Sequence, residues 1–251
     1  MSKAYKDYLG GSLNPKKAIE KIKADIEFMR EHPTYFKPDG FICFEGVQGG
    51  GKTSSAVEYV HRLALEYPKA WICTNIYLDF PDCDNKIIPY VDYRQVQTLD
   101  NGFDGIILLI DEIQILFNSL ESAKIDPSWF TIISQQRKRR LHVVGTAQNF
   151  SRIAKCWREQ ATACIKCVQY FGIIQYRGLW DLQKVELDEN ENVIKAPVSE
   201  MYWSFIDSTV FAMYDTWQKI DRKESSKDVS SRRKSNACLP DNIVRAGGSV
   251  D

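Results

Sequence analysis

The sequence predicts an α/β fold in which helices sandwich a mainly parallel central sheet. Three short, mostly apolar runs, at residues 41–44, 106–110 and 141–148, are typical of strands that are buried on both faces. The first run is followed by a helical pattern of apolar residues at 53–65. Strands that alternate with helical patterns in this way are typical of α/β proteins with a parallel sheet.

The first run leads into a glycine-rich segment, residues 46–53, which has the phosphate-binding P-loop pattern G-x-x-x-x-G-K-[ST]. Glycines allow the backbone to aim several N–H groups at phosphate oxygens, and the next helix adds the positive end of its dipole. We expect Lys52 to contact the β- and γ-phosphates of a nucleotide. A plain glycine-rich turn between strand and helix is the competing interpretation. The predicted nucleotide-binding residues are Gly46, Val47, Gln48, Gly49, Gly50, Gly51, Lys52, Thr53 and Ser54.

The second run ends in two acidic residues, Asp111 and Glu112. An aspartate at the tip of a hydrophobic strand suits a nucleotide-bound Mg²⁺, and a glutamate beside it can polarise an attacking water molecule. The sequence therefore predicts Thr53 and Asp111 as the side chains around Mg²⁺, and Glu112 and Lys52 as catalytic residues. An acidic pair that merely caps a helix is the alternative.

A basic run precedes the third strand. Residues 126–139 predict one helix, capped by Asp126, that ends in Arg137-Lys138-Arg139-Arg140. Two interpretations remain open for these cations. They form a solvated helix end that interacts with the helix dipole, or they include an arginine that reaches a neighbouring subunit or DNA. Arg137, Arg139 and Arg140 are therefore candidate catalytic residues.

Composition limits the partners. The 33 basic and 33 acidic residues cancel, so any surface that binds nucleic acid must be local.

The seven cysteines, in a sequence without a secretory signal, predict reduced thiols in a cytoplasm. Cys164 and Cys167 lack a second pair at ligand spacing and fall in an expected strand, and the three histidines are scattered, so no zinc site is expected. No apolar run is long enough to span a membrane.

The remaining elements follow from local patterns. Ile19, Ile22, Ile26 and Met29 form an apolar stripe, which predicts a surface helix from residue 15 to near residue 32 that packs one face. The aromatic-rich residues 201–220 are expected to pack back on the core. Further strands are expected at 70–76, 86–90, 161–169 and 173–180, short helices at 93–99 and 151–158, and a hairpin of 183–187 with 192–195.

Three segments are expected along the chain. Residues 1–38 form an N-terminal arm and helix, and residues 39–220 form the domain with the P-loop and a C-terminal β-rich segment. Residues 221–251 are rich in Lys, Arg, Ser, Asp and Gly, which predicts a flexible, locally basic tail.

Three stretches, residues 46–53, 106–114 and 137–148, resemble the HerA/FtsK-type P-loop ATPases. The resemblance is nearest to the zonular occludens toxin family, which includes filamentous-phage assembly ATPases, and viral genome-packaging ATPases are similar. It covers about residues 40–217. Filamentous-phage members carry a membrane span after the ATPase domain, and this sequence does not show one, which favours a motor without a membrane anchor.

The resemblance implies more than the motifs do. It implies a RecA-like P-loop NTPase fold with an additional strand between the two motifs and a catalytic glutamate. It implies ATP and Mg²⁺ as cofactors, and Gln148 as the residue that senses the γ-phosphate or positions water. It also implies a homo-oligomeric ring, a hexamer or pentamer, that moves DNA.

The main hypothesis is an ATP-hydrolysing motor that translocates DNA in viral genome packaging or phage assembly. Capsid or assembly proteins would be its partners, and it would act in the host cytoplasm or on the virion. One alternative is a nucleoside kinase similar to thymidine kinases, which share the Asp-Glu and following Gln of residues 110–114. Those kinases bind zinc through cysteines, and the missing second cysteine pair counts against this alternative. The other is a non-motor nucleotide switch that controls assembly.

Overall fold

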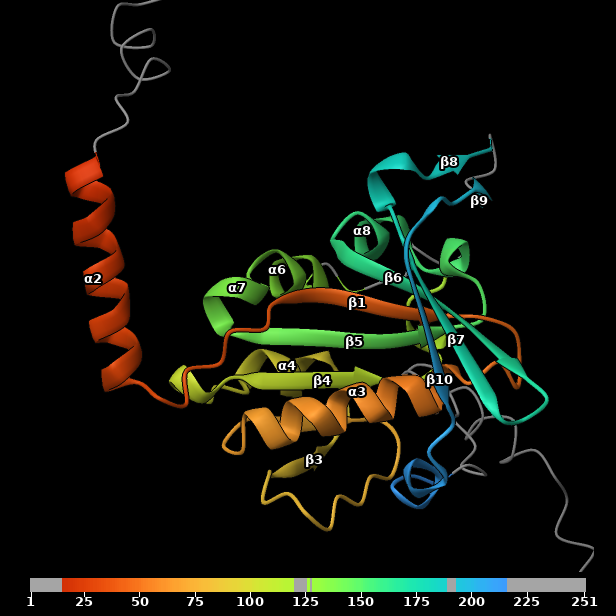
Figure 1. The fold of residues 1–251 in the computed structure, drawn as a ribbon, viewed down its shortest axis with the longest axis horizontal. Coiled ribbons are helices and arrows are strands. Elements are labelled where there is room, and N and C mark those ends of the chain that lie inside the picture. The colour runs from red at the N-terminus through yellow and green to blue at the C-terminus, as the bar shows by residue number, and fades with distance from the viewer. Residues whose placement is uncertain (1–14, 120–125, 127, 189–192, 216–251) are drawn as a thin grey trace, which may run out of the picture. The chain divides into compact units, whose positions relative to one another are not determined.

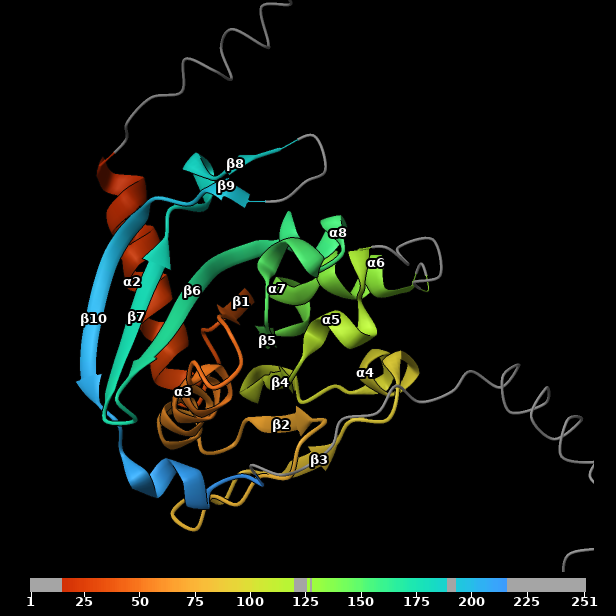
Figure 2. The same cartoon turned by 90° about the vertical axis from the view of Figure 1, so that its right-hand side faces the viewer.

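The computed structural model describes residues 15–119, 126, 128–188 and 193–215. Strands among these residues form one eight-stranded sheet, in the order β10-β7-β6-β1-β5-β4-β2-β3, and a separate two-stranded sheet (Figures 1 and 2). Contacts divide the chain into residues 1–218 and 219–251, and the second unit lies outside the described residues. The strands of the large sheet are β1 (Gly40–Glu45), β2 (Trp71–Thr74), β3 (Ile87–Pro89), β4 (Ile106–Ile110), β5 (Leu141–Ala147), β6 (Ala161–Tyr170), β7 (Ile174–Trp180) and β10 (Val198–Phe205).

The sheet is parallel from β3 through β2, β4, β5 and β1 to β6, and β7 and β10 extend it in antiparallel pairing. Strand β5 lies between β1 and β4, and its Gly145 is level with Cys43 of β1 and with Ile110 of β4. One additional strand therefore separates the strand that enters the P-loop from the strand that ends in Asp111. This topology confirms the predicted P-loop NTPase fold of the additional-strand type.

Helices cover both faces of the central strands (Figure 2). Phe41 of β1 packs on Trp157 with ring centroids 5.4 Å apart, whereas Phe44 points to the other face and lies 6.0 Å from Tyr59 of α3. Every residue of β4 and β5 is buried, as continuous apolar runs predict. The helices are α2 (Pro15–Glu31), α3 (Lys52–Glu66), α4 (Tyr93–Thr98), α5 (Ile113–Leu116), α6 (Ser128–Ser134), α7 (Gln136–Arg139) and α8 (Lys155–Arg158).

Helix α2 forms where it is predicted, but it contains no buried residue. The expectation that its stripe packs against the rest of the chain is wrong for the described residues. In the described part of the chain, aromatic contacts of this region lie at the C-terminal end of α2, where the rings of Phe28 and of His32, just after the helix, are 5.9 and 4.3 Å from that of Phe103. An apolar stripe shows that a helix has one apolar face, but not that the same chain covers that face. The exposed members of the stripe are Ile19, Ile22 and Ile26.

Two expected helices are each split. The helix over 126–139 becomes α6 and α7, which meet at Gln135, and the Ser134 hydroxyl donates back to the Thr131 carbonyl within 3.2 Å. The helix over 151–158 becomes η3 (Phe150–Arg152) and α8. Ile153 and Ala154 between them have extended ψ angles and are fully buried, so core packing interrupts this helix.

The aromatic segment over 201–220 packs on the core only in part, so that expectation is also corrected. Residues 201–205 belong to β10, which pairs with β7 alone at the edge of the sheet. Tyr202, Trp203 and Phe205 are exposed there, because an edge strand leaves much of its surface open. Tyr214, after η5 (Ser208–Ala212), is buried, and Trp217 lies outside the described residues.

The hairpin and the two closely spaced cysteines lie in the elements that the sequence predicts for them. The expected hairpin exists as β8 (Glu186–Leu187) and β9 (Val193–Lys195), preceded by η4 (Leu182–Lys184). Cys164 and Cys167 lie on β6 and are both fully buried free thiols, Cys164 beside the Cys43 thiol and Cys167 beside the Ser55 hydroxyl. No helix among the described residues is both long and apolar enough to cross a membrane. The expected arm at 1–13 and tail at 221–251 lie outside those residues.

Candidate nucleotide-binding and hydrolysis site

The P-loop connects β1 to α3 and lies against the backbone of β6. A Cβ atom built on Gly46 would come within 2.4 Å of the Cys167 carbonyl oxygen, so this position has no room for a side chain. Gly51, just before α3, has φ of 79°, a left-handed conformation that glycine adopts without steric cost. The glycines of the pattern thus bring the loop close to β6 and turn it sharply into the helix.

Gln175 of β7 supports the loop from behind, and the sequence analysis did not identify it. Its side chain is buried, and Nε2 donates to the carbonyl oxygen of Gly50 at 3.2 Å. The same amide nitrogen donates to the carbonyls of Val168 and Tyr176 at 3.3 and 3.1 Å. A Cβ atom at Gly51 would lie 2.0 Å from Gln175 Oε1, so a side chain there would displace this glutamine and would also be strained by the left-handed backbone. A glutamine within a strand has no local signature, so only the fold reveals this support.

Lys52 is the first residue of α3, and its side chain folds over the loop. It is buried, with Nζ donating to the Val47 carbonyl oxygen at 3.3 Å. This position holds the ammonium group inside the curve of the loop, where phosphate oxygens of a nucleotide would lie. The predicted role of Lys52 is therefore compatible with its placement.

A network of oxygen atoms joins the P-loop to the tips of β4 and β5. The hydroxyls of Thr53 and Thr146 both donate to Asp111 Oδ1, at 2.9 and 2.6 Å. The side chain of Asn75 fixes the Asp111 backbone, because it donates to its carbonyl at 2.9 Å and accepts from its N–H at 2.8 Å. Oxygen ligands of this kind suit Mg²⁺, so the predicted pair Thr53 and Asp111 fits that ion. Thr146 and Asn75 were not predicted, because single polar residues near the end of a strand are common.

Glu112 has φ of 53° and ψ of 49°, a left-handed conformation that is uncommon for residues other than glycine. Its backbone N–H donates to the Thr146 hydroxyl at 2.9 Å, and its carboxylate accepts from the amides of Gln114 and, at 3.5 Å, Gln148. It is the N-cap residue of α5, but its side chain makes no capping hydrogen bond, which argues against the interpretation that its carboxylate merely caps the helix. The structure thus brings Gln148, beyond the end of β5, to the predicted catalytic glutamate.

A cavity of about 460 Å³ connects these groups. The P-loop and the acidic pair form one part of its wall, and the C-terminal segment forms another. That segment is held by a backbone bridge between Leu78 and Tyr214 and by a hydrogen bond of 2.8 Å from Asp79 N–H to the Met213 carbonyl. The lining residues are Gln48, Gly49, Gly51, Lys52, Thr53, Ser54, Ile76, Asp111, Glu112, Gln169, Phe211, Tyr214 and Asp215.

The basic run lies elsewhere, at the opposite end of β5 from Gln148. Arg139 Nη2 donates to three carbonyl oxygens at the end of α4, at distances of 2.6 to 3.1 Å. The Arg140 guanidinium lies 4.9 and 4.5 Å from the ring centroids of Tyr35 and Phe103. The Arg137 side chain is 92% exposed. The structure therefore brings none of these three arginines into the cavity of its own chain.

Comparisons with known proteins agree with this fold. The family described as zonular occludens toxin (Zot) matches residues 41–219. The N-terminal domain of zonular occludens toxin from Neisseria meningitidis is 15% identical, with a TM-score of 0.51, over 71% of this chain and 100% of that one. No curated protein sequence matches significantly.

Two other solved structures show weaker likeness. The DNA-packaging ATPase B204 of Sulfolobus Turreted Icosahedral Virus is 15% identical, with a TM-score of 0.41, over 51% of this chain and 75% of that one. The ATPase domain of G40P is 11% identical, with a TM-score of 0.44, over 78% of this chain and 99% of that one. Because the family match covers most of the chain and the topology is that of a P-loop NTPase, the chain belongs to the zonular occludens toxin (Zot) family.

Proposed function

We propose that this protein is an ATP-hydrolysing motor that translocates DNA. One observation carries the hydrolytic part of the proposal. Glu112 lines the same cavity as the P-loop, and its carboxylate accepts a hydrogen bond from Gln148. This arrangement provides a base for water and a cradle for phosphate in a single site.

The P-loop residues would bind the phosphates of ATP through their backbone N–H groups. Lys52 would exchange its bond to the Val47 carbonyl for contacts to the β- and γ-phosphates. Thr53 and Asp111 would hold Mg²⁺, which neutralises charge that develops on the phosphate oxygens. Thr146 would keep the Asp111 carboxylate in place, because its hydroxyl already donates to Oδ1.

Glu112 would accept a proton from the attacking water, and Gln148 would orient that water through its amide. The hydrogen bond from the Glu112 N–H to Thr146 fixes the backbone of the glutamate next to Asp111. The proposed base is therefore held by the same threonine as the proposed metal ligand, which couples the two halves of the site.

Phe211 and Tyr214 would enclose the adenine base. Both line the cavity beyond the P-loop, and aromatic faces bind nucleobases by stacking. The polar groups of Gln169 and Asp215 lie on the same cavity and would reach the edge of the base.

Translocation of DNA by a ring of subunits is proposed from membership of the Zot family and from the resemblance in the sequence. Viral genome packaging or phage assembly would be the process, in the host cytoplasm or on the virion. Of the three candidate arginines, Arg137 is the one we assign to a neighbouring subunit's site, because its side chain is almost fully exposed and its ion pair with Asp39 is long, at 3.9 Å. Arg139 and Arg140 are engaged within their own chain.

The test is phosphate release with no DNA, single-stranded DNA and double-stranded DNA, together with the oligomeric mass in solution. Stimulation by one form of DNA in an oligomer is expected. Arg137→Ala subunits should lose turnover and regain part of it when mixed with Lys52→Ala subunits, which cannot hydrolyse but can lend Arg137. A rate of ATP hydrolysis that does not change when DNA is added would contradict the proposed motor function. Phosphorylation of thymidine would show a nucleoside kinase instead.

A further inference from the structure

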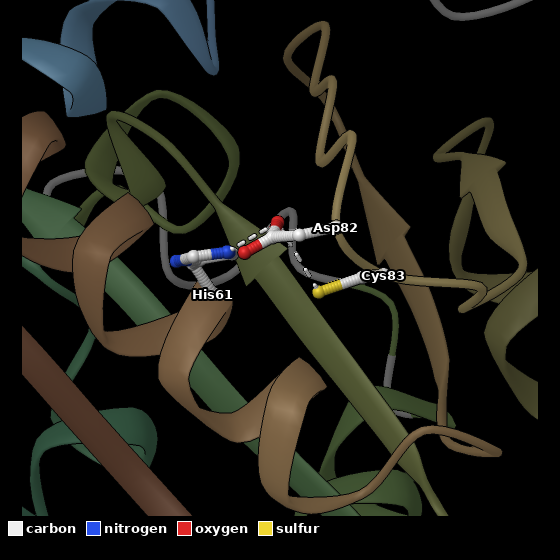
Figure 3. Close-up of side chains that lie close together, drawn as sticks. All are labelled: His61, Asp82 and Cys83. Atoms are coloured by element: carbon white, nitrogen blue, oxygen red, sulfur yellow. Dashed lines mark hydrogen bonds and ion pairs between the residues drawn. The ribbon is translucent and has the colours of Figure 1, made fainter.

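We propose that His61, Asp82 and Cys83 form a zinc-binding site that fastens α3 to the loop between β2 and β3. Figure 3 shows the three side chains pointing toward one another. His61 Nε2 lies 2.8 Å from Asp82 Oδ1, and Cys83 Sγ lies 3.8 Å from the same oxygen. All three ligand atoms lie within 4.8 Å of one another, and among the described residues this is the group of three that fulfils this condition.

These donors match zinc by type and by spacing. Zinc binds imidazole nitrogen, carboxylate oxygen and thiolate sulfur at about 2.0 to 2.3 Å in a tetrahedron, which places ligand atoms roughly 3.4 to 3.6 Å apart. The two measured separations from Asp82 Oδ1 lie on either side of that range. Small side-chain rotations would therefore produce the site, and water or Asp84 would supply the fourth ligand.

The loop holds its two ligands in place without an ion. The ring of Phe80 is buried and lies 5.0 Å from the ring of His61, and the Cys83 N–H donates to the Phe80 carbonyl at 3.1 Å. On the other side, the Asn85 amide donates to the carbonyls of Tyr67 and Ala70 at 2.8 and 2.9 Å. The segment between Phe80 and Asn85 is thus anchored at both ends, so little conformational entropy opposes binding.

The local charge also favours a cation. The carboxylate of Asp82 lies beside the other two ligand atoms, and Asp84 follows Cys83 in the chain. Both negative charges attract a divalent ion. When zinc binds, the S–H bond of Cys83 breaks, a sulfur–zinc bond forms, and the proton passes to solvent with no change of oxidation state.

The site would connect the P-loop helix to the edge of the sheet. Helix α3 begins at Lys52 and carries His61 in its second half, whereas Asp82 and Cys83 belong to the connection into β3. None of the three residues lines the nucleotide cavity. Zinc bound here would stabilise the fold around α3 without entering the proposed chemistry of ATP.

The experiment uses the full chain after removal of metals with a chelator. Titration with zinc chloride by calorimetry should show one tight site, and cobalt chloride should give a thiolate charge-transfer band. His61→Ala and Cys83→Ser should each weaken zinc binding by at least about tenfold, and Cys83→Ser should abolish the cobalt band. Cys156→Ser is the matched control, because Cys156 is also partly exposed but belongs to no such group in the described part of the chain.

Folding of each variant is checked by circular dichroism, and Asp82→Asn, which keeps the shape of the side chain, gives an independent variant. In the parent, zinc should raise the melting temperature, and at the same zinc concentration this rise should be smaller in all three variants. Zinc affinity and a cobalt band that persist in folded His61→Ala and Cys83→Ser proteins would overturn the proposal. Loss of binding in Cys156→Ser would overturn it equally, because the thiol ligand would then lie elsewhere.

Discussion

The two ends of β5 use their polar side chains in opposite ways. At the carboxyl end, Thr146 and Gln148 bond to the side chains of Asp111 and Glu112, and both carboxylates face a cavity of about 460 Å³. The hydrogen bonds from these neighbouring side chains go to one oxygen of each carboxylate, Asp111 Oδ1 and Glu112 Oε2. Parallel strands bring these residues together because their carboxyl ends share one edge of the sheet.

At the amino end of β5, the polar groups serve the chain itself. Arg139 bonds to carbonyls of α4, Arg140 lies over Phe103, and His142 bonds to the Tyr59 hydroxyl at 2.9 Å and the Asp39 carbonyl at 3.1 Å. The comparison teaches that charge alone does not distinguish a site from a structural contact. What distinguishes them is whether the polar side chain lines a cavity or is engaged entirely in contacts within its own chain.

The largest effect is expected at the carboxyl end, from Lys52→Ala. Loss of the P-loop ammonium should abolish ATP turnover while the fold persists, because the ammonium donates to the backbone of the exposed loop residue Val47. Phosphate release and a thermal melt measure both properties. Lys69→Ala, which removes an exposed lysine outside the cavity, is the control. Normal turnover in a folded Lys52→Ala protein would disprove the assignment of this end as the active site.

Glu112→Gln should give the next largest effect. Turnover is expected to fall by roughly 10²-fold or more, because the amide cannot accept the proton of the attacking water. ATP binding, measured with a fluorescent analogue, should persist because Thr53 and Asp111 are unchanged. Glu31→Gln on α2 serves as the control. Loss of binding rather than of hydrolysis would mean that Asp111 and Glu112 have exchanged roles.

Arg139→Ala tests the amino end. Removing its guanidinium leaves three carbonyls of α4 without their donor, so the free energy of unfolding should fall by about 1–3 kcal/mol. Turnover per folded molecule should stay near that of the parent. Urea denaturation measures the first quantity, and Lys138→Ala, at an exposed neighbour, should change it by less than about 0.5 kcal/mol. An Arg139→Ala protein with parental stability but without ATP turnover would show that this arginine acts in hydrolysis rather than in folding.

The smallest effect is a pH dependence at His142. Burial lowers the pKa of this imidazole, so the folded protein holds it neutral, whereas the unfolded chain gains a proton near pH 6.5. The free energy of unfolding should therefore fall as pH drops below about 6.5, by at most ~1.4 kcal/mol per pH unit, until the folded-state pKa is reached.

Denaturation of the parent and His142→Gln at several pH values isolates this contribution from those of other histidines. The difference between the two proteins should be constant above about pH 7 and should change below about pH 6.5. A difference that stays constant across the whole range would show that His142 does not couple to folding.

The sequence predicted those parts of the site that are local in the chain. Lys52 and Thr53 belong to one short pattern, and Asp111 is recognisable because it ends a buried strand. Thr146 and Gln175 were missed, since each is a single polar residue in a strand and acquires its role only from neighbours far away in sequence. Local signals identify residues whose partners are local.

The same reasoning explains the other differences. In the proposed zinc site, His61 precedes Asp82 by 21 positions, and Cys83 follows Asp82 directly. No short ligand spacing in the sequence therefore reveals this group. The aromatic residues of β10 predict burial by composition, but they belong to an edge strand. Burial depends on which elements become neighbours, and this is a property of topology rather than of local pattern.

The left-handed backbone of Glu112 has a consequence for selection experiments. A residue with a Cβ atom in this conformation costs about 1–2 kcal/mol relative to glycine, and asparagine also tolerates it well. Libraries screened for heat resistance alone should therefore enrich glycine or asparagine at position 112. Such clones would survive higher temperatures and lack the carboxylate, so thermal screening of this protein needs a parallel screen for turnover.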